Sequence, residues 1–471
     1  MEKIWILSLV GSLAWVAAVM LALAGIGDCV LGALRQSRGW IASFVSGLCV
    51  VVMLGGWLNF LHGIRSGVLI AIVVVGVALG VMQIFREGVP RVTLFRNEAE
   101  RSAWVLFLVA CCVVLVAFRV IATVHRINYE PVDDLNEYLV MPHQMLQQHY
   151  FAADPFSERR LINSVGPTYF VQALIVAVLP LTHLQMADET IGLMFLLVCL
   201  VSLAVRWKVP TWAACVAVLA SYGAIQSTFN LSFSILPGAL LTAMIIFAYE
   251  EKSWKTWELG ILLGGTAGVI CGLKTTYLPH AALLVLGLIL VRRTQGGWVE
   301  KLRGCAGGIV GFLVVLGPWM IAMRETSGTF LFPIFGQGIH YPRYYHLQKA
   351  VWKAHSIQDM VNMLWLLPVF GLLLLAVRQQ RNSTASRIAA VFVGATTLAS
   401  VLLSVATAGD SVLRYNIPCV FPALVVAFLL FARQWNLESR DAARMGCVYT
   451  GALLLVLVCV MGTQVVQAEA I

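Results

Sequence analysis

The sequence has few charged residues. Only 12% of its 471 residues are Asp, Glu, Lys or Arg, whereas 60% are hydrophobic. A water-soluble domain has about 25% charged residues because its surface must be solvated. So little charge over so long a chain excludes an ordinary soluble globular protein. It indicates that most of the molecular surface meets an apolar medium.

The sequence also lacks CxxC pairs and the alternating ten-residue segments of a transmembrane β-barrel. Of its eleven cysteines, several lie inside apolar runs, where cysteine is typically a small buried apolar residue: Cys111, Cys112, Cys199, Cys271 and Cys459. The net charge of +9 does not indicate nucleic acid binding, because the basic residues lie in short loops between apolar runs.

Long apolar runs are present almost from end to end. A membrane-spanning helix needs about 20 apolar residues. Runs near that length are found at 4–27, 40–58, 66–84, 103–122, 188–205, 210–226, 231–248, 257–273, 277–291, 305–323, 360–377, 387–407, 416–432 and 444–465. The sequence therefore predicts an all-α polytopic membrane protein with about 14 transmembrane helices. The first run is longer than a signal peptide core, so we expect it to be a retained span.

Arginine and lysine predict the orientation, because cytoplasmic loops are enriched in them. We place in the cytoplasm the loops in which basic residues gather: 35–38, 86–101, 252–255, 292–303, 378–387 and 433–444. Residues 167–183 are apolar enough to span, but a crossing there would move every later basic loop outside. We therefore expect 167–183 to lie along the outer surface or to enter the membrane only partway. Long outer loops are then predicted at 123–187 and 324–359, and a short one at 410–416.

The first outer loop contains an adjacent pair of carboxylates, Asp133 and Asp134. Mutual repulsion and partial desolvation favour protonation of one of them, a condition suited to general-base catalysis. The pair can also hold a divalent cation through its oxygen atoms. A solvated acidic turn or a helix cap has the same charge pattern, so these interpretations stay open.

Arg159 and Arg160 form a basic pair in the same loop. Guanidinium groups bind phosphate through forked hydrogen bonds, but they also pair with nearby carboxylates or contact lipid headgroups. His143 is a candidate proton carrier or substrate contact. Its spacing from His149 fits no standard zinc pattern, and a plain surface role is equally consistent.

Further motifs follow in a defined order. Tyr138 comes four residues after Asp134, and an expected surface helix opens with Pro167 and Tyr169. Two later stretches lie at predicted outer ends of spans: Gly272-Leu-Lys274-Thr-Thr-Tyr277-Leu-Pro279, and Arg414-Tyr415 followed by Pro418 and Pro422. Together with the acidic pair, these stretches resemble the GT-C glycosyltransferases, a superfamily that includes protein O-mannosyltransferases and lipid A aminoarabinose transferases.

The resemblance implies a GT-C-like core over residues 103–432, with the two long outer loops. About three extra spans would precede it in residues 1–102. A cytoplasmic loop and a last span would follow in residues 433–471, with no soluble C-terminal domain. The extra spans, the missing domain and the single proline of the surface helix are departures from the family pattern.

The resemblance also implies an activity, namely transfer of a sugar from a polyisoprenyl-phosphate donor to a glycan, lipid or protein acceptor. The reaction would take place on the extracytoplasmic face of the cell membrane. Asp133 would be the general base, and Asp134 would support it or bind a divalent cation, which is the one cofactor considered. The donor phosphate would be held by Lys274, Arg414, Arg159 and Arg160. Substrate contacts are expected from Tyr138, His143, Tyr277 and Tyr415.

Several of these residues also have plain structural interpretations. Lys274 can extend its amine to the membrane interface, and Arg414 can pair with Asp410, four residues earlier. Asp28, near the inner end of the first span, is expected to be an interfacial cap. The aromatic residues of 330–346 suit either interfacial anchoring or a lid over the substrate.

Other functions have weaker support in the sequence. A transporter or flippase typically has ionisable residues near the midplane and repeated halves, and neither pattern is evident here. A polysaccharide polymerase or ligase would use the same kind of donor. Its site would have a different set of residues, usually rich in arginines at the outer face. A non-catalytic scaffold with the same fold also fits, because fold alone does not determine function.

Overall fold

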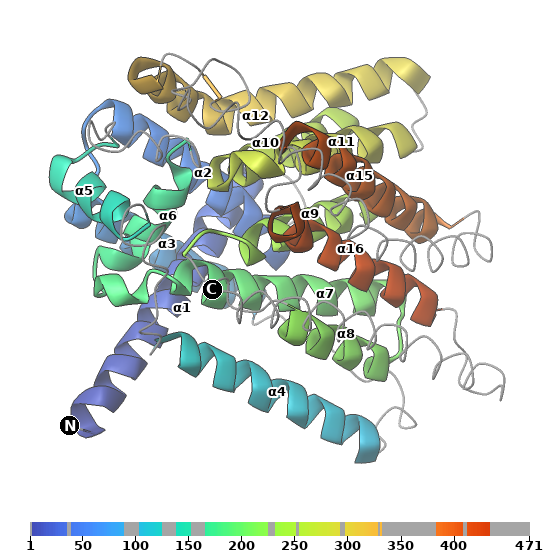
Figure 1. Cartoon of the computed structure of the whole chain (residues 1–471), viewed down its shortest axis with the longest axis horizontal. Coiled ribbons are helices and arrows are strands. Elements are labelled where there is room, and N and C mark those ends of the chain that lie inside the picture. Colours follow the sequence, from blue (N-terminus) through green and yellow to red (C-terminus); the bar gives the residue numbers. More distant parts are fainter. Residues whose placement is uncertain are drawn as a thin grey trace, which may run out of the picture.

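The structure is a computed structural model that describes residues 2–34, 39–88, 103–124, 138–151, 165–224, 231–250, 254–292, 297–327, 330–331, 383–407 and 412–433. These residues form a helical bundle with no strand among them (Figure 1). The α-helices are α1 (Glu2–Ala33), α2 (Trp40–Phe60), α3 (Ser66–Glu87), α4 (Ala103–Val124), α5 (Val140–Gln148), α6 (Pro167–Val176), α7 (Leu193–Trp207), α8 (Thr211–Ala224), α9 (Ile235–Tyr249), α10 (Thr256–Leu273), α11 (Leu278–Val291), α12 (Gly297–Ser327), α15 (Thr384–Thr407) and α16 (Val412–Arg433). Shorter helical turns are η4 (Leu181–His183), η5 (Met186–Gly192) and η6 (Thr275–Tyr277).

Eight helical segments in the described part of the chain are long and apolar enough to cross a membrane: Ser8–Ala33, Trp40–Phe60, Ser66–Arg86, Val105–Val124, Leu181–Trp207, Thr256–Leu273, Gly297–Glu325 and Thr384–Leu403. Shorter apolar helices are Pro167–Val176, Thr211–Ser221, Ile235–Tyr249, Thr275–Val291 and Pro418–Arg433. The predicted all-α class with several apolar spans is therefore confirmed. The spans expected at 360–377 and 444–465 lie outside the described residues.

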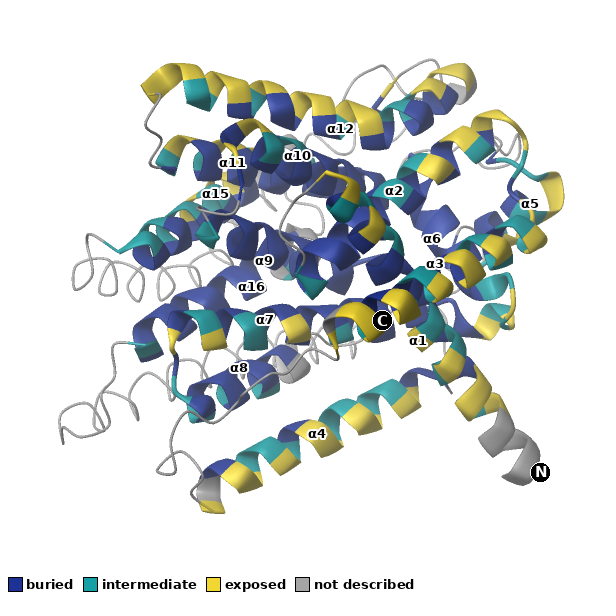
Figure 2. Ribbon diagram, turned by 180° about the vertical axis from the view of Figure 1, so that it is seen from behind, coloured by how far each residue is buried: buried dark blue, intermediate teal, exposed yellow. Residues whose placement is uncertain are grey.

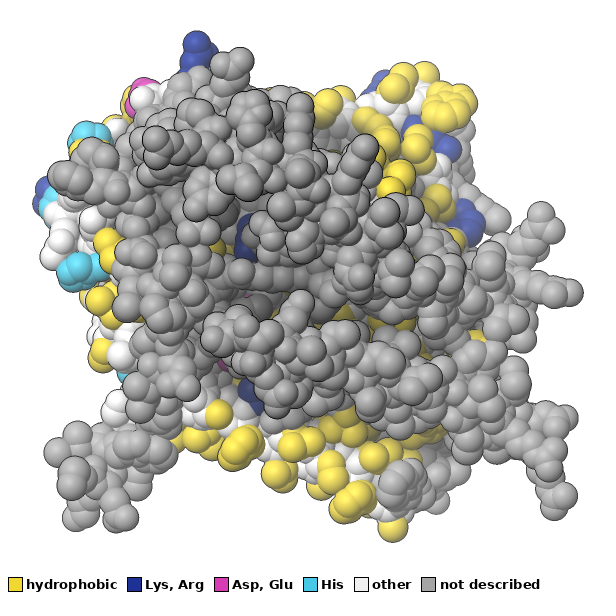
Figure 3. All heavy atoms as spheres, in the orientation of Figure 1, with side chains coloured by type: hydrophobic (Ala, Val, Ile, Leu, Met, Phe, Trp, Pro, Cys, Tyr) yellow, Lys and Arg dark blue, Asp and Glu magenta, His cyan; other side chains and the backbone are white. Residues whose placement is uncertain are grey.

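The outward faces of the bundle are apolar. Helix α4 exposes Phe107, Val113, Val114 and Phe118 along its length. Figure 2 shows the exposed residues repeating along this helix, and Figure 3 shows hydrophobic side chains gathered along it at the edge of the molecule. Contiguous exposed apolar surface of this kind is unfavourable in water, and it suits contact with lipid chains.

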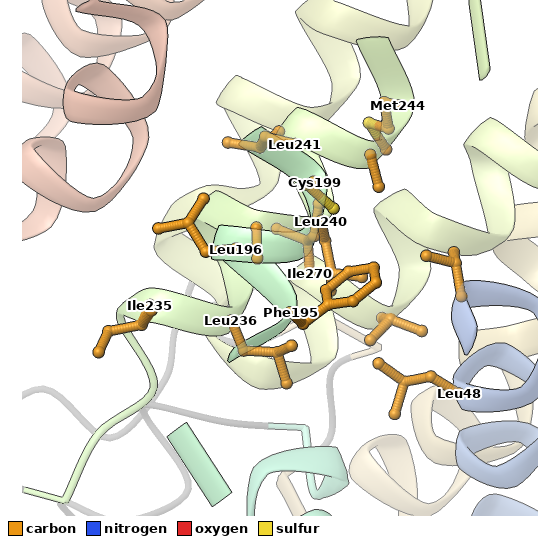
Figure 4. Packing of buried hydrophobic residues seen from close by; sticks show 14 of the residues in the cluster. Leu48, Phe195, Leu196, Cys199, Ile235, Leu236, Leu240, Leu241, Met244 and Ile270 are labelled. Carbon is orange, nitrogen blue, oxygen red and sulfur yellow. The ribbon is translucent and has the colours of Figure 1, made fainter. Parts of the chain in front are cut away.

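The centre of the bundle is formed by α2, α7, α9 and α10. Their side chains interdigitate in Figure 4, with Leu48, Phe195, Leu240 and Ile270 from the four helices in turn. All residues of α9 from Ile235 to Ala248 are buried, as expected for a helix that is hydrophobic on every side.

Glycines allow close approach of α10 and α12. A Cβ atom on Gly264 would lie 1.9 Å from the carbonyl oxygen of Gly308, and one on Gly260 would lie 2.1 Å from that of Gly304. Small residues at such contacts let helix backbones meet directly. Residue numbers rise in the same direction along both sides of this contact, so α10 and α12 run parallel. Helix α11, which connects them in the sequence, runs in the opposite direction.

Basic residues gather at one end of the bundle, here called the basic end. Arg206 at the end of α7 forms an ion pair with Glu250 at the end of α9. Arg292 donates to the carbonyl of Trp254, and Arg387 donates to that of Val291 at 3.0 Å. The positive-inside rule predicts that this end faces the cytoplasm.

Helix α6 is short for a membrane crossing, and the expectation that 167–183 does not span stays a prediction. Its 10 residues extend about 15 Å, whereas the hydrocarbon core is about 30 Å thick. Residues Pro167 to Ile175 are all buried. Helix α6 contacts α2, α3, α5 and α10, so other helices surround it on the side opposite the basic end.

The expectation that Asp28 caps the first helix is wrong. Helix α1 continues past it to Ala33, and the Asp28 side chain is buried. The apolar run ends near Gly27, but the helix does not, because its last turns pack against α2 and α3.

Candidate functional site

A buried cation lies opposite the basic end, where α10 ends. Helix α10 stops at Leu273, and the next residue, Lys274, is extended, with φ −160° and ψ 121°. The residue is only 5% exposed. It is followed directly by η6 and then by α11, so the chain reverses direction around Lys274. An ionisable residue buried beside a membrane span is a functional candidate by default.

The first turn of α6 packs against this reversal. The Thr168 hydroxyl donates a hydrogen bond to the carbonyl oxygen of Leu273. The Pro167 ring fills the space beside Gly272, where a Cβ atom would lie 2.5 Å from its Cγ. Only glycine fits at position 272, and this explains how α6 reaches the residue next to Lys274.

Residues 231–234, which precede α9, lie at the same end of the bundle as Lys274. The Tyr277 hydroxyl donates to the carbonyl of Phe233 at 3.3 Å, and the Gln172 amide donates to the carbonyl of Leu231 at 2.9 Å. Both side chains are buried. Residues 231–234 are thereby held between η6 and α6.

Asp188 fixes the start of α9. Its carboxylate accepts hydrogen bonds from the backbone N–H groups of Ser234, Ile235 and Leu236 at 2.8–3.0 Å, and from the Ser234 hydroxyl at 3.1 Å. It thus caps the N-terminus of α9 from η5, 46 residues earlier in the chain. The first N–H groups of a helix have no partner within the helix and need such an acceptor.

The first turns of α16 also reach this end, because α16 contacts both η6 and α9. Asn416 is buried, and its side chain lies beside that of His280. His280, one turn beyond η6, lies 3.3 Å from the hydroxyl of Ser400, measured from Nε2. Polar side chains therefore lie next to the turn at Lys274, where α11, α15 and α16 meet.

Aromatic rings extend the cluster toward α5. Tyr169, beside Thr168 in α6, lies with its ring centroid 6.4 Å from that of Tyr138 and 5.3 Å from that of Phe151. All three rings are buried. Tyr138 therefore packs beside Tyr169, the residue next to Thr168 in α6.

Several helix N-termini lie at the end that contains Lys274, namely those of α6, α9, α11 and α16. A helix N-terminus has a partial positive charge of about half an elementary charge. Asp188 compensates the charge at the start of α9, and Glu189 beside it in η5 is a second buried carboxylate. The N-termini of α6, α11 and α16 add to the positive charge of Lys274, and helix N-termini are sites where phosphate groups can bind.

The structure brings together part of the predicted site. The Tyr277 N–H donates to the Lys274 carbonyl at 3.1 Å, Tyr138 packs beside Tyr169 of α6, and the backbone of Arg414 and Tyr415 is in the first turn of α16. His143 is exposed on α5, where Nε2 lies 2.8 Å from the Gln147 amide nitrogen, so it is not part of this buried cluster.

The other predicted site residues, Asp133, Asp134, Arg159 and Arg160, lie outside the described residues. Their roles stay predictions, as does a cation at the acidic pair. Within the described segments, no group of three His, Cys, Asp or Glu side chains is placed to hold a metal ion.

Sequence reasoning missed Thr168, Gln172 and Asp188. Asp188 could have been found in the sequence, because Asp188-Glu189 is an ionisable pair within an otherwise apolar segment. Ionisable residues inside a membrane are unfavourable and so indicate a specific role. Thr168 and Gln172 could not have been found, since their partners are backbone carbonyls 105 and 59 residues away.

An apolar groove opens beside this region. It has a volume of about 580 Å³ and lies between α1, α4, α7 and α8, and Thr190 of η5 also lines it. Among its lining side chains are Leu13, Val116, Val120, Met194, Leu197 and Val218. Helix α4 forms one wall of the groove and is itself exposed, so the groove lies at the edge of the described bundle.

Comparisons of the chain with protein-family models, curated proteins and solved structures found no match. The fold itself defines the class as an all-helical protein whose described part contains eight helices long and apolar enough to span a membrane.

Proposed function

We propose that this protein is a membrane glycosyltransferase that moves a sugar from a polyisoprenyl-phosphate donor to an acceptor at the face opposite the basic end. The observation that supports it best is the buried Lys274 beside several helix N-termini, where a phosphate would find a cation and N–H donors. By the positive-inside rule, this face is extracytoplasmic.

The apolar groove supports the lipid part of the donor. A polyisoprenyl chain is wholly apolar and enters from the bilayer, so it needs an apolar groove that is open to lipid. The groove beside α4 is apolar and lies at the edge of the described bundle, and its Thr190 is two residues from Asp188, which caps α9 at the Lys274 end. The proposal places the isoprenoid chain in the groove and the phosphate near Lys274.

The reaction follows from this placement. The acceptor's nucleophilic oxygen or nitrogen attacks C1 of the sugar, and a new bond forms as the bond from C1 to the phosphate oxygen breaks. The polyisoprenyl phosphate leaves with an additional negative charge, which Lys274 and Arg414 stabilise. Asp133 takes the proton of the nucleophile. Asp133 is five residues before Tyr138 in the sequence, which ties the acidic pair to the aromatic side of the cluster.

The test is release of sugar from a radiolabelled polyprenyl-phosphate sugar by the purified protein, with water as the surrogate acceptor. Lys274→Met is expected to lower donor affinity, and Asp133→Asn to leave donor affinity intact while lowering turnover at least about 100-fold. Lys208→Met, at the basic end, is the matched control and is expected to match the wild type. Wild-type donor affinity in Lys274→Met would remove Lys274 from the proposal, and wild-type turnover in Asp133→Asn would remove Asp133.

A further inference from the structure

A polar cavity lies at the basic end of the bundle, opposite the end that contains Lys274. It has a volume of about 200 Å³ and is formed by α1 and α3. Its lining residues are Gly25, Asp28, Cys29, Gly32, Ala33, Leu79, Met82, Gln83 and Arg86. The roles proposed above for Lys274 and the acidic pair do not involve any of these residues.

Glycine contacts set the register that forms this cavity. A Cβ atom on Gly25 would lie 2.2 Å from the Gly80 nitrogen, and one on Gly76 would lie 2.6 Å from the Ala22 Cβ. Helices α1 and α3 are therefore parallel and in backbone contact at this level. One turn further, the same register places Asp28 opposite Gln83.

The cavity contains a buried polar group without a partner. Gln83 is 1% exposed, and neither its amide nitrogen nor its amide oxygen forms a hydrogen bond within the described segments. A buried amide with both groups unpaired is destabilising, because each group has lost its hydrogen bonds to water. A bound polar ligand would remove that cost.

The lining has both signs of charge. The Asp28 carboxylate is buried at the inner part of the cavity, whereas Arg86 is exposed in the last turn of α3. Asp28 is five residues from the end of α1, about 8 Å along the helix axis. Asp28 therefore lies close to the basic end of the bundle. Gly25 and Gly32 have no side chains to fill the space.

We propose that this cavity binds a zwitterionic group with an ammonium and a phosphate, as in the headgroup of phosphatidylethanolamine. Asp28 and the Gln83 oxygen would accept hydrogen bonds from the ammonium, and Arg86 would pair with the phosphate. The inference is independent of the proposed glycosyltransferase activity, because it involves the opposite end of the bundle.

Cys29 provides a direct readout, because it lines the cavity and is exposed. The protein is placed in nanodiscs of phosphatidylglycerol with or without phosphatidylethanolamine, and alkylation by N-ethylmaleimide is followed by mass spectrometry. Phosphatidylethanolamine is expected to slow alkylation of Cys29 about tenfold through occupancy of the cavity. Cys305 on α12 is the internal control, and its alkylation rate is expected not to change.

Variants separate the cavity from general lipid effects. Asp28→Asn and the near-isosteric Gln83→Met are expected to abolish the protection of Cys29, and Arg86→Gln to weaken it. Arg65→Gln, at the opposite end of α3, is expected to retain it. If Asp28→Asn fails to fold, Gln83→Met still provides the test.

Free phosphoethanolamine, added to phosphatidylglycerol discs, distinguishes a soluble zwitterion from a lipid headgroup. Protection by the free compound equal to that by the lipid would assign the cavity to a soluble ligand of the same chemistry. Equal Cys29 rates in the two lipid compositions, together with no effect of free phosphoethanolamine, would overturn the proposal. So would full protection by phosphatidylethanolamine in both Asp28→Asn and Gln83→Met.

Discussion

The hydroxyl of Thr168 donates a hydrogen bond to the carbonyl oxygen of Leu273, which joins the first turn of α6 to the last residue of α10. Lys274 follows directly. A helix that is short for a membrane crossing is thus attached to the turn that contains the buried cation. Because this contact links residues 105 positions apart, it is one of the features that hold the proposed donor site together.

Thr168→Val is expected to lower the free energy of unfolding by about 1–3 kcal/mol, because the Leu273 carbonyl is left buried without its donor. The same variant is expected to weaken binding of polyprenyl phosphate, since α6 would no longer be held beside Lys274. Thermal unfolding in detergent and native mass spectrometry measure the two effects. Thr168→Ser retains the hydroxyl and is the control. Unchanged stability in Thr168→Val would contradict the importance of this bond.

Asp188→Ala is expected to destabilise the protein by more than the ~1 kcal/mol of an ordinary helix cap. The substitution leaves three backbone N–H groups of α9 without their acceptor in a buried site. The matched control is Glu258→Gln on α10, where a more solvated side chain accepts one hydrogen bond from the Lys255 N–H at 3.0 Å. Its effect is expected to stay below about 1 kcal/mol. Thermal unfolding of the two variants tests the difference, and equal losses would count against the cap.

The sequence predicted the long helices well, because an apolar run of about 20 residues is a local property. The run 257–273 matches α10 (Thr256–Leu273) almost residue for residue. Helix α6 differs: its composition is equally apolar, but its packing depends on neighbours such as Gly272, which meets Pro167, and Gly55, which meets Phe170. Helix α1 extends beyond its apolar run, and so the Asp28 prediction failed.

For the candidate site, the sequence singled out Lys274 as a cation at the end of a span, and the structure shows that it is buried. Its role stays a prediction. The capping of α9 by Asp188 was not predictable, because its partners are brought close only by the packing of α7 against α9. The same limit applies to Gln83, whose lack of partners is a property of the α1–α3 contact.

Gly264→Ala is expected to destabilise the bundle by about 1–3 kcal/mol, because the new methyl group would overlap the Gly308 carbonyl. Gly394→Ala in α15 is the matched control, since a Cβ atom there meets nothing within 4 Å. That variant is expected to be neutral or slightly stabilising, as alanine favours a helix over glycine by about 1 kcal/mol. Thermal unfolding in detergent measures both, and equal stability would contradict the contact between α10 and α12.

Cysteine accessibility tests the orientation. In a background in which Cys29, Cys447 and Cys459 are replaced by serine, Arg65→Cys is expected to be labelled by a membrane-impermeant maleimide in intact cells, because Arg65 lies at the end opposite the basic one. Lys255→Cys, at the start of α10, is expected to be labelled only after permeabilisation. The reverse pattern would invert the topology and place the Lys274 site in the cytoplasm.

The central claim is that Lys274, the start of α6 and the start of α16 form one site for a lipid-linked phosphate. Photocrosslinking with a polyprenyl phosphate analogue that has its reactive group beside the phosphate measures this most directly. The account predicts crosslinked peptides from 165–175, 270–280 and 412–420, and their loss in Lys274→Met but not in Lys208→Met. Crosslinks confined to the basic end, or equal labelling of both variants, would contradict it.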